Sequence, residues 1–307
     1  MARLVFLGTP DAAVPPLRTL VEAGHDVALV VTRVDKRRGR GGAPAPSPVK
    51  VAATELGIPV SHSLEDVVGV GAELGVVVAY GRIIPVDVLR QLAMVNLHFS
   101  LLPRWRGAAP VERAILEGDA ETGVCLMAVE AGLDTGGIYA EESTVIGDEE
   151  TAEELRARLV VIGCSLLGRL ADGLAGLPPP RDQVGSPSYA EKIQAGELHL
   201  HWDQPALQVR RVIRLGRAWT TFRGRRLTVL RATGSEAGRG PSAGGGAPTG
   251  AEPSTGAEPG VLDGTEVVAG DGHRVVLVTV QPEGRRPMDA SDWLRGVRPE
   301  PGARLGD

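Results

Sequence analysis

Apolar residues along the first 170 positions follow two alternating patterns. Short, continuous apolar runs predict buried strands, and between them apolar residues recur every three or four positions, which predicts helices. The predicted strands cover residues 3–8, 26–32, 76–79, 95–99, 123–129 and 138–146. Continuous apolar strands separated by helices are typical of a doubly wound, largely parallel α/β sheet.

The predicted helices of this region differ in length. The first carries Val14, Leu17 and Val21, is expected to be capped by Asp11, and ends at Gly24. Further helices are expected after Pro48, near Pro85 and over residues 111–116. The longest buries a stripe that consists of Leu155, Leu159, Ile162, Leu166 and Leu170.

The pattern changes after residue 180. Three prolines at 178–180 predict an extended linker, and a short helix is expected from Pro205. Strands are then predicted at 219–222, 225–232, 265–269 and 274–280, with a hairpin turn at 222–225 and a short helix at 291–294. Several short strands in succession favour a small β-barrel. The segment 234–260, almost wholly Gly, Ala, Pro, Ser, Thr and Glu, is predicted to be a disordered insertion. We therefore expect domains at 1–180 and 204–307, joined by a linker at 181–203.

One polar pair interrupts the apolar strand at 95–99. Val95, Leu97 and Phe99 alternate with polar residues, so Asn96 and His98 project from the same side of the strand. The strand then leads into a loop that contains Arg104–Trp105–Arg106. Ligands of open α/β sheets bind beyond such strand ends, so this pair is a candidate site.

The motifs around this pair resemble a known family. NLHFSLLPRWRGAAP at 96–110 and GLDTGG at 132–137 are similar to the signature of the folate-dependent formyltransferases. FLGTPD at 6–11, GRGGAPAPSPVK at 39–50, VVVAYGRIIP at 76–85, YAEK at 189–192 and QPEGRRPM at 281–288 extend the resemblance along nearly the whole chain. It implies a Rossmann-like formyltransferase domain followed by a β-barrel domain of oligonucleotide-binding type. The implied activity transfers formyl from 10-formyltetrahydrofolate to the amino group of initiator methionyl-tRNA.

The resemblance also assigns roles to individual residues. Asn96, His98 and Asp134 occupy the catalytic positions, and formyl transfer to an amine requires a donor toward the developing oxyanion and a proton shuttle. Asn96 supplies an amide N–H and His98 can relay a proton. Asp134 would attract the protonated imidazole or bind a water that carries the proton away. The turn expected to contact the folate consists of Ser100, Leu101, Leu102 and Pro103. Taken singly, a strand histidine is more often a core residue and an Asp before Thr-Gly more often a turn residue.

Basic residues are concentrated in two segments although the net charge is −5. Residues 36–54 contain five cations and no carboxylate, and residues 204–231 contain eight arginines and no carboxylate. One such run would be a solvated face, but two favour binding to RNA phosphates. The residues expected to contact tRNA are Arg40, Lys50, Arg214 and Arg217.

Several other functions are disfavoured by missing patterns. The first turn lacks GxGxxG, no serine lies in GxSxG, and the six histidines show no metal-ligand spacing, so we expect no nicotinamide, acyl-enzyme or metal chemistry. The two cysteines lack pairing motifs and no apolar run approaches a membrane span, which favours a cytoplasmic protein. No obligate protein partner is evident. A formyltransferase of sugar nucleotides or glycinamide ribonucleotide, and an RNA-binding relative without catalysis, remain the alternatives.

Overall fold

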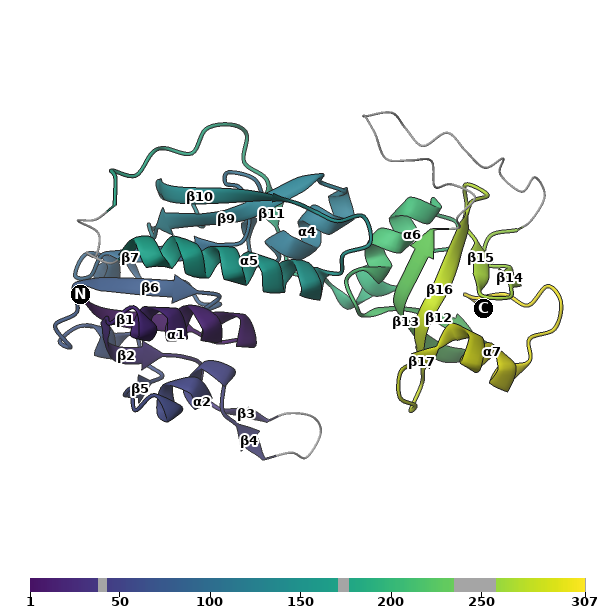
Figure 1. Cartoon of the computed structure of the whole chain (residues 1–307), viewed down its shortest axis with the longest axis horizontal. Helices are drawn as coiled ribbons and strands as arrows, with labels where there is room; N and C mark the ends of the chain where they lie inside the picture. Colours follow the sequence, from purple (N-terminus) through teal and green to yellow (C-terminus); the bar gives the residue numbers. More distant parts are fainter. Residues whose placement is uncertain (38–42, 171–176, 235–257, 307) are drawn as a thin grey trace. The chain divides into compact units, whose positions relative to one another are not determined.

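The computed structural model describes residues 1–37, 43–170, 177–234 and 258–306 and contains two compact units (Figure 1). Unit 1 comprises Met1–Arg113, Ala120–Ile146 and Glu154–Glu191. Unit 2 comprises Ala114–Asp119, Gly147–Glu153 and Lys192–Asp307. Among the described helices, none is long and apolar enough to cross a membrane.

Unit 1 is built on a seven-stranded sheet in the order β10-β9-β7-β6-β1-β2-β5. The strands from β7 through β5 in this order pair in parallel, whereas β9 and β10 are antiparallel to their neighbours. This confirms the predicted α/β class with a mostly parallel sheet. The strands are β1 (Arg3–Gly8), β2 (Asp26–Val31), β5 (Val60–Ser61), β6 (Leu74–Val78), β7 (Met94–His98), β9 (Glu121–Ala128) and β10 (Ile138–Val145).

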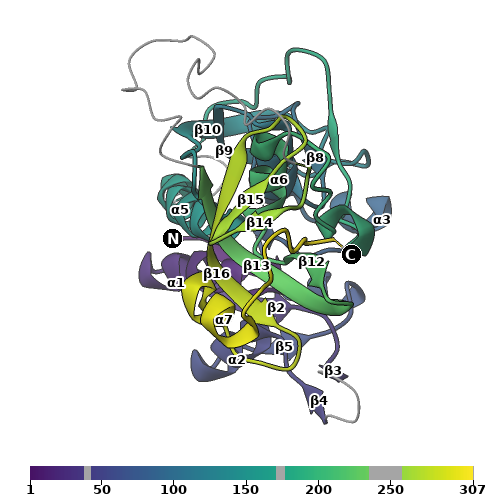
Figure 2. The ribbon, with the colours of Figure 1, turned by 90° about the vertical axis from the view of Figure 1, so that its right-hand side faces the viewer.

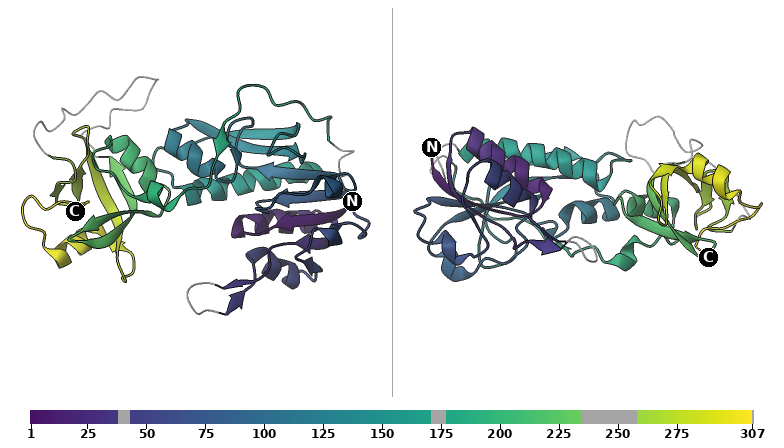
Figure 3. Two further views of the ribbon diagram at one scale, coloured as in Figure 1. Left: turned by 180° about the vertical axis from the view of Figure 1, so that it is seen from behind. Right: turned by 90° about the horizontal axis from the view of Figure 1, so that it is seen from below.

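Helices cover both faces of this sheet. α1 (Val14–Glu22) and α5 (Ala152–Leu167) lie side by side on one face (Figures 1 and 3), and the short α3 (Val86–Leu89) lies on the other (Figure 2). Val5 and Leu7 of β1 pack in one cluster with Val88 of α3. Because successive side chains of a strand point to opposite faces, residues 4 and 6 of β1, which are equally buried, belong to the α1 and α5 face.

The start of α1 differs from the prediction. Asp11 does not cap the helix, because it lies in a 3₁₀ turn, Asp11–Ala13, and the N-cap residue Ala13 makes no side-chain cap bond. Prolines near the first helical positions supply the helical φ instead. α2 (Pro48–Glu55) is capped as its sequence suggests, since the Ser47 hydroxyl accepts a hydrogen bond from the Lys50 amide at 3.0 Å.

Two short pairings hold the loops of unit 1. β3 (Lys36–Arg37) and β4 (Pro44–Ala45) pair in antiparallel fashion, and residue 40 between them lies outside the described residues. β8 (Arg106–Gly107) pairs in parallel with β11 (Tyr189–Ala190). The segment expected as a linker, 181–203, therefore adds a short strand beside the loop that follows β7.

Unit 2 is a β domain, as predicted, with the strand order β12-β13-β16-β15-β14 and with β17 paired to β16. Figure 2 faces this unit and shows the long strands β13 and β16 with α7 beside them. The turn between β12 and β13 has Arg223 and Gly224 at φ 51° and 69°, as a tight hairpin requires. Most of the predicted segment 234–260 lies outside the described residues. The elements of this unit are α6 (Ala206–Ile213), β12 (Ala218–Phe222), β13 (Arg225–Gly234), β14 (Leu262–Asp263), β15 (Glu266–Val268), β16 (Arg274–Pro282), β17 (Met288–Asp289) and α7 (Ala290–Val297). In α4 (Pro110–Glu117), residues 110–113 belong to unit 1 and residues 114–117 to unit 2.

Candidate functional site

Strand β7 carries the polar pair that the alternation predicted. Val95 and Leu97 are buried in the sheet, while Asn96 and His98 project from the opposite side of the strand. His98 is only 5% exposed and Asn96 is half-buried. Within the described residues the Asn96 carboxamide makes no hydrogen bond, so both its donor and its acceptor are available to a ligand.

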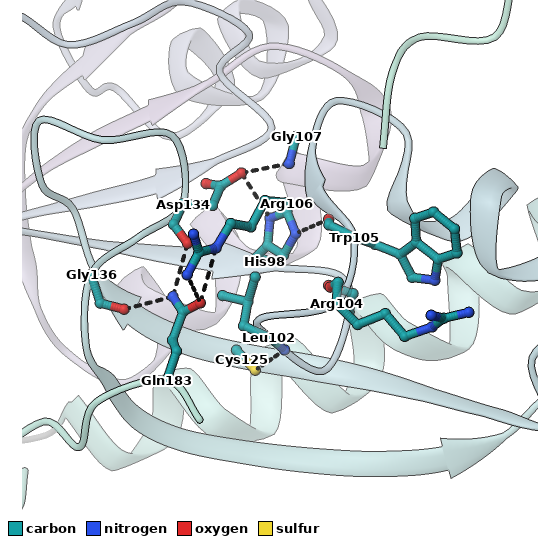
Figure 4. A network of polar contacts seen from close by, with 11 residues as sticks. His98, Leu102, Arg104, Trp105, Arg106, Gly107, Cys125, Asp134, Gly136 and Gln183 are labelled. Atoms are coloured by element: carbon teal, nitrogen blue, oxygen red, sulfur yellow. Dashed lines mark hydrogen bonds and ion pairs between the residues drawn. The ribbon is translucent and has the colours of Figure 1, made fainter. Parts of the chain in front are cut away.

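The main chain beyond β7 holds the His98 ring. The Trp105 carbonyl lies 2.8 Å from His98 Nε2, so Nε2 carries a hydrogen and donates it (Figure 4). Trp105 reaches this position through a left-handed backbone conformation, φ 64°, and the Ser188 hydroxyl accepts its amide hydrogen at 2.9 Å. In the neutral ring Nδ1 is therefore the nitrogen with a lone pair, and it can accept a proton.

Asp134 faces this second nitrogen. The loop that carries it leaves β9 beside Met94, because the Val129 amide donates to the Met94 carbonyl, and then folds back along β7. Asp134 Oδ2 lies 3.6 Å from His98 Nδ1, which is close enough for an ion pair but too long for a direct hydrogen bond. The two side chains are 16% and 6% exposed, so little water screens them.

Gly107 and Asp134 are held together by the main chain. The Gly107 amide donates to Asp134 Oδ2 at 2.8 Å, which fixes the carboxylate beside the imidazole. Gly107 has φ 121°, and a Cβ there would lie 2.9 Å from the carbonyl oxygen of Ala190 in the adjacent β11. This position therefore requires glycine.

Gln183 connects the loops on either side of the pair. Its Nε2 donates to the carbonyls of Asp134 and Gly136 at 2.8 and 2.9 Å, and its Oε1 accepts from Arg106 Nη2 at 2.7 Å and Nε at 3.1 Å (Figure 4). Gln183 is not among the residues predicted from the sequence, because no motif marks a single glutamine. Its contacts also join segments that are 49 and 77 residues apart.

The turn expected to contact folate follows directly after β7. Ser100 and Leu102 are buried, and the Ser100 hydroxyl donates to the Arg104 carbonyl at 2.6 Å. The Leu102 amide donates to Cys125 Sγ at 3.4 Å, and Leu102–Pro103 is a cis peptide bond. Burial raises the pKa of the Cys125 thiol to about 12, so this cysteine stays protonated and is a poor nucleophile.

The residues expected to contact tRNA have different surroundings. Lys50 Nζ pairs with Asp35 at 2.9 Å. Arg214 donates to the carbonyls of Glu150 and Gly147 at 2.7 and 2.8 Å, and burial and the nearby Arg210 lower its pKa. Arg217 is exposed. The arginine-rich segment 204–231 therefore contains both an arginine that hydrogen-bonds main-chain carbonyls of the same unit, Arg214, and an exposed cation, Arg217.

A cationic hollow of about 440 Å³ lies beyond the ends of β1, β2, β5 and β6. Among the described residues its lining includes three cationic side chains and no carboxylate, which suits an anionic ligand. Arg82 is oriented there by the His62 carbonyl and the Tyr80 hydroxyl, both at 3.4 Å. The lining residues are Thr9, Pro10, Arg33, Val34, Lys36, His62, Ala79, Tyr80, Gly81 and Arg82.

The fold and the site together define a class. An open, mostly parallel sheet presents an amide, an imidazole with one basic nitrogen and a facing carboxylate beyond a single strand. Such groups can donate to a developing oxyanion and move a proton, which are the requirements of group transfer to a nucleophile.

Comparison with known proteins identifies the family. Residues 2–168 match the family model described as formyl transferase, and residues 192–298 match its C-terminal domain. A methionyl-tRNA formyltransferase from Roseobacter denitrificans is 43% identical over 98% of this chain and 97% of that protein. One from Acidothermus cellulolyticus is 42% identical over 99% of both chains. The chain belongs to the formyl transferase family.

Solved structures share the fold at low identity. Methionyl-tRNA formyltransferase from Clostridium thermocellum matches with a TM-score of 0.57 and 19% identity, over 76% of this chain and 93% of that chain. An N-formyltransferase from Helicobacter canadensis, in complex with folinic acid and dTDP-3-aminofucose, matches with a TM-score of 0.66 and 18% identity, over 92% and 100%.

Proposed function

We propose that this protein transfers a formyl group to the amino group of initiator methionyl-tRNA, with 10-formyltetrahydrofolate as the donor. The observation that carries the proposal is the His98 ring, which has one nitrogen engaged by the Trp105 carbonyl and the other facing Asp134. Relatives named methionyl-tRNA formyltransferase are 43% and 42% identical to this chain over nearly its whole length, which supports the choice of acceptor. A translation enzyme of this kind would work in the cytoplasm.

His98, Asn96 and Asp134 would divide the chemical work. Formyl transfer places negative charge on the formyl oxygen and requires the attacking amine to lose a proton. The Asn96 carboxamide would donate to that oxygen, since it is half-buried and makes no hydrogen bond within the described residues. His98 Nδ1 would take the proton from the amine, and Asp134 at 3.6 Å would stabilise the resulting imidazolium. The bond between the formyl carbon and the donor nitrogen would then break, and tetrahydrofolate would leave after that nitrogen received the proton back from His98.

The donor would be held against the turn of Ser100, Leu101, Leu102 and Pro103. Leu102 packs with Cys125, Met127 and Ile138 in a buried apolar cluster, which would hold the turn in place while a flat heterocycle lies against it. The Ser100 hydroxyl is already bonded to the Arg104 carbonyl, so the turn would contact the donor through main-chain groups and apolar surface. A folate-derived donor agrees with the family and with a structural neighbour solved with folinic acid.

The tRNA would be bound through exposed cations on each unit taken separately. In unit 1 the hollow lined by Arg33, Lys36 and Arg82 suits phosphate, and Lys50 and Arg40 belong to the same basic segment. In unit 2 Arg217 is exposed, whereas Arg214 would support the fold through its two carbonyl contacts.

The decisive assay compares acceptors. Purified protein with 10-formyltetrahydrofolate should formylate charged initiator tRNA and should leave UDP-amino sugars unmodified. Formylation of the sugar nucleotide alone would favour the rival activity. The sugar-formyltransferase structures share only the fold with this chain, at 18% identity or less for those from Helicobacter canadensis and the WlaRD protein.

A further inference from the structure

A cluster of aromatic and cationic side chains lies at one edge of the unit 2 sheet, and the proposed chemistry does not use it. Trp219 of β12 has the His199 ring at 4.4 Å, tilted by 49°, and the Arg226 guanidinium lies 4.4 Å from the indole centroid. His201 adds a T-shaped contact to His199 at 4.8 Å. We refer to His199, His201, Trp219 and Arg226 as the Trp219 cluster.

Strand pairing brings these residues together at the surface. The Leu200 amide donates to the Trp219 carbonyl at 2.8 Å, so residues 199–201 lie along β12. Thr220 is fully buried, so Trp219 and Thr221 occupy the outer face of β12. Thr221 is paired with Arg226 of β13 in the sheet register, which places Arg226 diagonally from Trp219.

The exposure of the cluster is unusual for this chain. Three of the four tryptophans, Trp105, Trp202 and Trp293, are 5–8% exposed and belong to buried packing. Trp219 is half-buried, and His201 and Arg226 are exposed. Because Arg226 is exposed, a ligand that displaces its guanidinium from the Trp219 ring can reach the indole.

We propose that the Trp219 cluster is a stacking platform for an unpaired base of the tRNA, a role that rests on the proposed function. The base takes the place of the Arg226 guanidinium over the indole, and the released arginine moves to a phosphate. Stacking of a base on an aromatic ring is stronger than an exposed cation–π contact, so this exchange is favourable.

Charge and neighbours fit this occupant. Arg217, Arg223 and Arg225 around the same hairpin are exposed, and no carboxylate occurs from residue 204 to 231. Burial, and to a smaller extent His201, lower the pKa of His199, so its ring is uncharged at neutral pH and can pack on the indole without repelling these arginines. Backbone phosphates would be attracted by the arginines while a base stacks on the aromatic surface.

Tryptophan fluorescence of the unmodified protein tests the contact directly. Initiator tRNA without a bound amino acid and single-stranded oligoadenylate should each quench the indole emission and protect the indole from quenching by acrylamide. A blunt RNA duplex with the same number of phosphates should do neither. Quenching by tRNA should disappear in Trp219→Phe. Equal quenching by the duplex, or persistence of the quenching in Trp219→Phe, would overturn the platform.

Affinity measurements give the second test. Trp219→Leu should raise the Kd for tRNA about tenfold and leave kcat at saturating tRNA unchanged, whereas Trp219→Phe should retain most of the affinity. Arg226→Gln should weaken tRNA binding more than the control Arg295→Gln on α7, where Arg295 pairs with Asp292. Unchanged Kd in Trp219→Leu would refute the proposal even if formylation occurs. Loss of the proposed function would instead appear as no formylation by the wild type while tRNA still quenches Trp219.

Discussion

His98 and His199 are both held by a tryptophan, yet the two contacts differ in kind. His98 donates to the main-chain carbonyl of Trp105 and faces a carboxylate, whereas His199 packs on the ring of Trp219 beside a second histidine. The first environment leaves one polar nitrogen ready for a proton, and the second disfavours the charged ring. The difference shows that the groups within about 5 Å of the ring decide which histidine is placed to take a proton from a substrate.

Removal of His98 should give the largest contrast between the two environments. His98→Ala should lower kcat by about 10³-fold, because loss of a positioned acid–base group costs two to four orders of magnitude. His199→Ala should leave kcat unchanged and alter only the concentration of tRNA required. Comparable losses of kcat in the two variants would contradict the distinction.

Asp134→Asn tests the facing carboxylate with almost unchanged shape. The amide oxygen can still accept from the Gly107 amide, but the charge opposite His98 Nδ1 is lost. We expect kcat to fall about 10²-fold, with little change in donor affinity. Steady-state kinetics with both substrates would check this, and full activity of the variant would remove the carboxylate from the mechanism.

Gln183→Ala should weaken the same site indirectly. The variant loses four hydrogen bonds, which Gln183 makes to Asp134, Gly136 and Arg106. We therefore expect kcat to fall about tenfold and the free energy of unfolding to decrease by about 1–3 kcal/mol. Gln91→Ala, which removes a single exposed contact to the Asp87 carbonyl, is the matched control. An unchanged kcat would show that Asp134 keeps its place without this support.

Two arginines of unit 2 provide a comparison outside the catalytic residues. Arg214→Ala should destabilise the protein by about 2 kcal/mol, because it removes two charge-assisted bonds to main-chain carbonyls. Arg217→Ala should leave stability unchanged and weaken tRNA binding a few-fold. Denaturant melts and filter binding would measure the two effects, and a reversed pattern would contradict these assignments.

Acid should produce the smallest effect, at His199. Because burial lowers the pKa of His199 in the folded protein below the ordinary histidine value of about 6.5, the unfolded chain binds the proton more tightly. The stability that the neutral ring contributes is therefore fully present above about pH 6.5 and is lost as the pH falls from there through the folded pKa. Protonation should also quench Trp219, with a midpoint below 6.5 that is absent in His199→Gln. A midpoint above 6.5 would contradict the assigned environment.

The strand that carries Asn96 and His98 was predictable because alternation of apolar and polar residues determines which side chains share a face. Its partner Asp134 was predictable only through the family resemblance, since the loop folds back along β7 from the far end of β9. The role of Gln183 could not be predicted, because it depends on hydrogen bonds to three residues, Asp134, Gly136 and Arg106, that only the fold brings together.

The arginines show the same limit in unit 2. The absence of carboxylates between 204 and 231 marked a cationic segment, from which Arg214 and Arg217 were both expected to contact tRNA. Arg214 is turned toward the carbonyls of Gly147 and Glu150, which precede α5 and lie far away in sequence. Sequence periodicity predicts which side chains share one face of a helix or strand. The contacts of Arg214 depend instead on a distant segment, residues 147–150, that packs against this face.

The tautomer of His98 depends on a main-chain atom, the carbonyl of Trp105, and on the left-handed bend that aims it. No replacement of the indole deletes that oxygen. A designer who transplanted the histidine and its acidic neighbour onto another scaffold would have to copy the bend as well, because without it the ring could present the wrong nitrogen to the amine.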